Sequence, residues 1–134
     1  MSGAALMEFA LAWPIALLLV LASVETAVWG SEFFAARSAA LAGARAGAVV
    51  GAGPAVAVEV TLHALSPSLV GVTASAWCLG ESRPPPMVWV CARDAGAAIQ
   101  VDVGGAVPAL VPGVREGGLP LLVHVVIQKE AFAK

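Results

Sequence analysis

The stretch FALAWPIALLLVLASV, residues 9–24, contains sixteen residues and not one charge. Extended to Gly30 it covers 22 residues, among which Glu25 is the single charged one. A helix rises about 1.5 Å per residue and needs about 20 apolar residues to cross a bilayer. We therefore predict a membrane helix over about residues 9–30, bent by Pro14. Glu25 is expected at the outer membrane surface, with a contact to a second helix as the alternative.

The segment that follows, SEFFAARSAALAGARAGAVV (31–50), is rich in alanine and contains no proline. Because alanine has the highest helix propensity, the first helix is expected to continue to about residue 50. Gly43 and Gly47 are four residues apart, a spacing that lets two helix backbones approach closely. We predict that they contact neighbouring helices during assembly. The alternative is that these small residues only reflect a biased composition.

The sequence changes character at GAGP (51–54), where glycine and proline end the helix. A short helix over 54–65 is favoured because proline suits a first helical turn, with a strand as the alternative because the apolar residues also alternate. The predicted fold class is α+β, a long N-terminal helix followed by a small antiparallel β-sheet of three to four strands. The strands are expected in four β-branched or alternating runs: 69–78, 87–92, 97–103 and 119–128.

The overall composition limits the classes of protein that fit. The chain has 134 residues, enough for one small domain, which we place at 51–134. Hydrophobic residues make up 60% and charged residues 12%, which is more apolar than an ordinary soluble domain and indicates a membrane element. Seven basic and nine acidic residues give a net charge of −2, and the basic residues are scattered. We therefore expect no nucleic-acid partner.

The two cysteines are close in sequence. Cys78 ends one predicted strand and Cys91 lies in the next. We predict a disulfide that joins these strands as a hairpin, which requires an oxidising compartment and stabilises the fold by about 3 kcal/mol. Free buried thiols remain an alternative. A metal site completed by His63 and His124 is disfavoured, because cysteines that bind zinc together are normally two to four residues apart.

Side chains with catalytic potential are few, and their spacing matches no known catalytic constellation. His124 alternates with valines in a predicted strand, which favours a hydrogen-bonded position in the sheet over a general base. Asp102 has the pattern of an outward-facing strand residue. We therefore expect no enzyme activity, no cofactor and no metal. The residues considered are His63, His124, Asp94, Asp102, Glu81 and Glu116.

The N-terminal residues carry a resemblance to a known family. Gly3, four apolar residues, Glu8 and Phe9 come immediately before the apolar run, an order that resembles the processing signature of type IV prepilins and pseudopilins. GAALMEFALAWPIALLLVLASVETA (3–27) and ARSAALAGARAGAVV (36–50) are similar to the TadE-like family of the tight-adherence pilus. Members of that family carry a Glu-Phe or Glu-Tyr pair, an early proline and an AAREGAR-like stretch beyond the membrane.

The match continues along the chain with less specificity. The stretch beyond the membrane is AALAGAR (39–45) here, with Leu41 and Ala42 at positions where the family usually has charge. IQVDVGGAVPALVPGVREGGLPLLVHVVIQKE (99–130) resembles the family's strand, proline-containing loop and final strand ending in glutamate. The resemblance implies a pilin-like fold in which the N-terminal helix carries the small domain.

The resemblance also implies a processing step and a set of partners. Residues 1–3 would be a leader that a prepilin peptidase removes by cutting after Gly3, so that Ala4 becomes the N-terminus. An ionised Glu8 near hydrocarbon costs a few kcal/mol unless it is paired, and the ammonium of Ala4 on a neighbouring subunit would pair with it. The implied partners are that peptidase, other pilin and pseudopilin subunits, and inner-membrane lipid.

The resemblance gives the chain a location and a structural role. It would be a minor pilin, held by a single pass in the bacterial inner membrane with its domain in the periplasm, and later part of the pilus at the cell surface. There it would pack into the fibre or prime it. In an adhesive or priming role, loops 79–86 and 104–118 would bind a surface or a sibling subunit.

Other interpretations of the N-terminal segment stay open. Arg37 and Arg45 favour a cytoplasmic location for the end of the helix by the positive-inside rule, whereas the cysteines and the processing motif favour the opposite, which we adopt. Met1 and Ser2 provide no basic leader ahead of the motif. A secretory signal peptide cut before Ser23 would release a soluble domain. An uncut single-pass subunit of another membrane complex is the third possibility.

Overall fold

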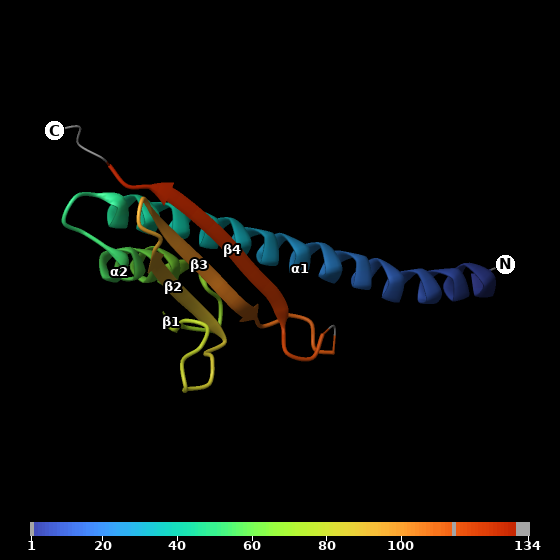
Figure 1. The fold of residues 1–134 in the computed structure, drawn as a ribbon. Coiled ribbons are helices and arrows are strands. Elements are labelled where there is room, and N and C mark those ends of the chain that lie inside the picture. Colours follow the sequence, from blue (N-terminus) through green and yellow to red (C-terminus); the bar gives the residue numbers. More distant parts are fainter. Residues whose placement is uncertain (1, 114, 131–134) are drawn as a thin grey trace.

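The computed structural model describes residues 2–113 and 115–130, and its dominant feature is a single long helix. Helix α1 spans Ser2–Ala48 and extends far beyond the rest of the chain at its N-terminal end (Figure 1). Pro14 lies inside α1, and the helix continues on both sides of it. The continuation to Ala48 agrees with the alanine-rich sequence, which favours helix after the apolar run ends.

Helix α2 spans Pro54–Leu65 and is followed by the short 3-10 helix η1, Ser66–Ser68. The turn between α1 and α2 uses positive φ angles at Gly51 and Gly53, which glycine adopts without a steric penalty. Pro54 occupies the first helical position, where its missing N–H costs nothing. The favoured helical alternative for residues 54–65 is therefore confirmed.

The remainder forms one four-stranded sheet in the order β1-β2-β3-β4. Strand β1 spans Ala74–Ala76, β2 Val88–Asp94, β3 Ala98–Val107 and β4 Leu119–Gln128. β2, β3 and β4 are antiparallel neighbours, in which Val90 pairs with Val103 and Val103 with Val123. Together with the two helices, this sheet confirms the predicted α+β class.

One prediction about the sheet is wrong: β1 runs parallel to β2, so the sheet is mixed and not purely antiparallel. Residues 77–87 connect the two strands, and a connection of about a dozen residues is long enough to return the chain for parallel pairing. Three consecutive prolines, Pro84–Pro86, prevent this return segment from pairing as a strand itself. β1 is accordingly only three residues long.

The core lies between the sheet and the two helices, both of which cover the same face (Figure 1). α1 packs against β3 and β4, and α2 packs against β2. On α1 the buried positions are mostly alanine and glycine, which lets the helix axis come close to the sheet. The valine-rich side of the sheet fills the space with Val88, Val90, Ile99, Val101, Val103, Val107, Leu121 and Val123.

Candidate functional site

Residues 3–24 of α1 extend away from the domain, and we call this segment the apolar arm. Every residue of the arm is exposed, and Glu25 is the first buried position after it. Its 22 residues span about 33 Å at 1.5 Å per residue, close to the thickness of the hydrocarbon core of a bilayer. α1 is long and apolar enough to cross a membrane: its most apolar stretch has a mean hydropathy of 2.2, and no part of that stretch is buried.

The residues of the expected processing motif lie in the first turns of the arm. Gly3, Ala4, Glu8 and Phe9 are all helical and exposed. The Phe9 ring stacks on the ring of Trp13 one turn later, with centroids 6.2 Å apart. Among the residues that the structure describes, no ion pair includes Glu8. Its carboxylate is therefore free to meet a group from outside the chain.

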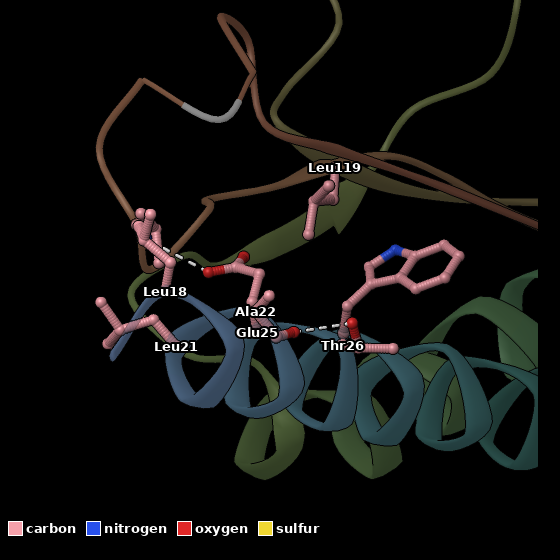
Figure 2. Close-up of a pocket in the computed structure, with 8 residues that line it drawn as sticks. Leu18, Leu21, Ala22, Glu25, Thr26 and Leu119 are labelled. Atoms are coloured by element: carbon pink, nitrogen blue, oxygen red, sulfur yellow. Dashed lines mark hydrogen bonds between the residues drawn. The ribbon is translucent and has the colours of Figure 1, made fainter. Parts of the chain in front are cut away.

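Glu25 joins the arm to the domain. Its side chain is 8% exposed and accepts hydrogen bonds from the backbone N–H groups of Leu110 and Val111, at 2.8 and 3.0 Å. Both donors belong to the loop between β3 and β4, and Figure 2 shows the carboxylate turned toward that loop. Glu25 therefore binds its own domain, a contact that the sequence did not predict.

An apolar cavity of about 350 Å³ surrounds this contact. Figure 2 shows it between the end of the arm and the start of β4, with Leu119 opposite the helix. The expected membrane segment, about 9–30, thus overlaps the part of α1 that carries the domain. The residues that line the cavity are Leu18, Leu21, Ala22, Glu25, Thr26, Trp29, Val111 and Leu119.

Glu32, two turns after Glu25, forms a second contact of the same kind. Its side chain is 2% exposed and accepts a hydrogen bond from the Val70 N–H at 3.1 Å. Burial raises the pKa of the Glu32 carboxyl above its ordinary value; the Val70 N–H opposes this shift and the Glu25 charge adds to it. The sequence analysis did not identify Glu32. The available signal was its seven-residue spacing from Glu25, which puts both carboxyls on one face of the helix.

Substitution of Glu32 by glutamine is expected to change how stability depends on pH. Because its pKa is raised on folding, the charged form destabilises the folded state. The stabilisation by protonated Glu32 is complete below its unfolded pKa and is lost as pH rises through the folded pKa. Glu32→Gln should therefore gain free energy of unfolding relative to wild type as pH is raised from 4 to 8. Denaturant unfolding in detergent micelles, followed by tryptophan fluorescence, measures this difference.

Glu81 provides the matched control for this experiment. The Cys78 N–H and the Arg83 side chain lower the pKa of the Glu81 carboxyl. Its stabilisation is present above the unfolded pKa and is lost as pH falls through the folded pKa. Glu81→Gln should therefore lose stability relative to wild type as pH rises. If the free energy of unfolding of Glu32→Gln, relative to wild type, changed with pH in the same direction as that of Glu81→Gln, the raised pKa of Glu32 would be contradicted.

Gly43 and Gly47 lie where α1 meets α2. A methyl group on Gly43 would overlap Thr61 Oγ1 and lie 2.5 Å from the Ala57 carbonyl oxygen. A methyl group on Gly47 would lie 2.7 Å from Ala57 Cβ. The predicted close approach of two helices is present, but its partner is α2 of the same chain and not a neighbouring subunit. Both glycines are buried in this contact.

The far edge of the domain is held by the predicted disulfide. Cys78 and Cys91 are bonded, with their Cα atoms 5.0 Å apart. The bond joins the segment after β1 to the parallel strand β2, so the expected hairpin is absent although the pairing is confirmed. Beside it the rings of Trp77 and Trp89 meet edge to face, with centroids 5.6 Å apart. The Trp77 indole N–H donates to the Arg83 carbonyl oxygen at 3.0 Å, which fixes the return loop.

His124 and Asp102 are opposite each other on β4 and β3 and form a hydrogen bond. The second Asp102 oxygen accepts a hydrogen bond from the Gln100 amide at 2.9 Å. His124 is thus a hydrogen-bonded sheet residue, as predicted. Within residues 2–113 and 115–130, no group of three metal-ligating side chains comes together.

A scan against protein-family models, a search of curated proteins and a search of solved structures each found no match to this chain. The resemblance to the TadE-like family therefore depends on the sequence motifs alone.

Proposed function

We propose that this chain is a minor pilin-like subunit of a tight-adherence pilus, which its apolar arm anchors in the inner membrane before assembly. The observation that carries the proposal is the arm itself. It leaves 22 residues of apolar helix uncovered, with one carboxylate, Glu8, four residues after Ala4. An apolar surface of this size needs lipid or other protein around it.

The arm is covered by lipid before assembly and by other subunits after assembly. In the bilayer, lipid covers the arm and the periplasm holds the disulfide-bonded domain. In the fibre, the arms of neighbouring subunits replace the lipid, and the Ala4 ammonium of one subunit neutralises Glu8 of the next. A charge at the centre of the bilayer costs about 2.5 to 3.5 kcal/mol without a partner, and this is the upper limit for Glu8, which lies near one end of the arm. Pairing it with the Ala4 ammonium would fix the axial position of each subunit.

The mass of the mature N-terminus tests the processing step. Protein isolated from its native membrane should begin at Ala4. A mature form that begins at Ser23 would contradict the proposal and support a cleaved signal peptide. An uncut N-terminus would support an accessory subunit of another membrane complex.

Glu8→Ala is expected to leave expression and membrane insertion intact and to reduce incorporation into fibres at least tenfold. The loss of a pair worth a few kcal/mol accounts for that factor, since about 1.4 kcal/mol corresponds to a factor of ten. Immunoblots of sheared fibres and of membranes measure the two pools. Glu59→Ala, which removes an exposed carboxylate on α2, is the matched control and should have no effect. Normal incorporation of Glu8→Ala would contradict the role given to this carboxylate.

A further inference from the structure

β4 is the last strand of the sheet, and within residues 2–113 and 115–130 one of its edges pairs with no other strand. The Lys129 N–H donates to the Ala97 carbonyl oxygen at 2.9 Å, which identifies residues 97 and 129 as a hydrogen-bonded pair. In an antiparallel ladder such pairs alternate with pairs that point away from each other. The N–H and C=O groups of Leu122, His124 and Val126 therefore point away from β3, toward the free edge.

Both ends of this edge are held by α1. The Trp29 indole N–H donates to the Pro120 carbonyl oxygen at 3.1 Å, and the Glu130 N–H donates to the Ala48 carbonyl oxygen at 3.3 Å. The free edge thus runs beside α1 in the same direction, as Figure 1 also shows. Between these two contacts, no hydrogen bond within the described chain uses the outward backbone groups of residues 122, 124 and 126.

A groove of about 370 Å³ lies along this edge. One wall is formed by residues 122–125 of β4, and the other by Phe33, Arg37 and Leu41 of α1. Those three side chains form one stripe because they are four residues apart. Arg37 is exposed and takes part in none of the ion pairs of the described residues. The groove therefore combines unpaired backbone groups, two apolar contacts and a central positive charge.

We propose that the free edge of β4 binds an extended segment of a partner protein as a fifth strand. The repeated outward N–H and C=O groups can all be paired at once by an extended backbone. Phe33 and Leu41 are about 12 Å apart along the helix, which matches the distance of about 13 Å between positions i and i+4 of a strand. The partner segment carries an apolar residue, then an acidic residue for Arg37, then a second apolar residue, at every second position.

Charge argues that the partner is not a second copy of this chain. Edge-to-edge pairing of two copies would bring two Arg37 guanidinium groups into one groove, where no carboxylate of either wall would neutralise them. Like charges placed together disfavour such a pair, whereas a carboxylate from another protein removes the repulsion. This surface belongs to the domain and is independent of the proposed pilus function.

Two capped peptides test the proposal on the full-length protein in detergent micelles. The first, KTVTETVTK, presents valine, glutamate and valine at alternate positions, and the second, KTVTKTVTK, replaces the glutamate with lysine. The first should bind at least tenfold more tightly at low salt and should protect the amides of Leu122, His124 and Val126 from hydrogen exchange. Arg37→Glu should reverse the preference between the peptides.

Proline substitution tests the strand pairing. His124→Pro and Leu122→Pro each remove an outward N–H without removing a bond to β3, and each should weaken binding at least tenfold. His124→Thr keeps the N–H and is the matched control. The exchange experiment on wild-type protein needs no variant, so it decides the question even where a proline variant fails to fold. Absence of binding, equal binding of both peptides, or a dimer that the first peptide does not displace would each overturn the proposal.

Discussion

Gly43→Val is expected to destabilise the domain by about 3 kcal/mol, at the upper end of the range for overpacked cores. Even one methyl group at this position overlaps Thr61 Oγ1, and α2 cannot move away without leaving the sheet that it covers. Thr61 is itself fully buried and donates to the Ala57 carbonyl oxygen at 2.7 Å, so its hydroxyl has no free space to rotate into. Denaturant unfolding in micelles, followed by tryptophan fluorescence, measures the loss.

Gly30→Ala is the matched control, because it changes a glycine of the same helix. Apart from its chain neighbours and the backbone of its own helix, no atom lies within 4 Å of an added methyl group at Gly30. Alanine should therefore stabilise α1 by up to about 1 kcal/mol through its higher helix propensity. Equal effects of the two substitutions would show that the position of α2 against Gly43 is not required for stability.

Removal of the disulfide has the second large expected effect. The double variant Cys78→Ser, Cys91→Ser should lose about 3 kcal/mol, because the bond closes a loop with a sequence separation of 13. Loss of this cross-link would also weaken the short strand β1, which depends on β2 for its pairing. The midpoint of denaturant unfolding, measured with and without reductant, gives the loss of stability caused by removal of the disulfide.

Wild-type protein provides the control for the disulfide. Reductant should shift its midpoint toward that of the double serine variant and should leave the variant unchanged. A wild-type midpoint that does not respond to reductant, at full reduction of the cysteines, would contradict the expected contribution. The magnitude follows from restriction of the unfolded chain, so it should be similar for protein in micelles and in lipid.

The parts of the fold that were predictable from sequence depend on neighbouring residues. The alanine-rich run after Gly30 predicts the extension of α1 because helix propensity is local, and Pro54 marks the start of α2 for the same reason. The valine-rich alternation predicts β2, β3 and β4. The disulfide was predictable because only two cysteines are present and their spacing excludes most other roles.

The parts that could not be predicted join residues far apart in the chain. Glu25 meets Leu110 across 85 positions and Glu32 meets Val70 across 38, and no local pattern encodes either contact. The direction of β1 was missed because three residues carry too little pattern to fix an orientation. The glycine spacing on α1 correctly predicted a close helix contact, but the spacing is the same for a partner within the chain and for one outside it.

The Glu25 contact has a mechanical consequence. The β3–β4 loop is bonded to the helix at the first residue after the arm, so no flexible linker separates the arm from the domain. When the end of the arm next to Glu25 tilts or rotates, the sheet is expected to rotate with it. Any array that aligns its arms would thereby present identical faces of every domain at its surface.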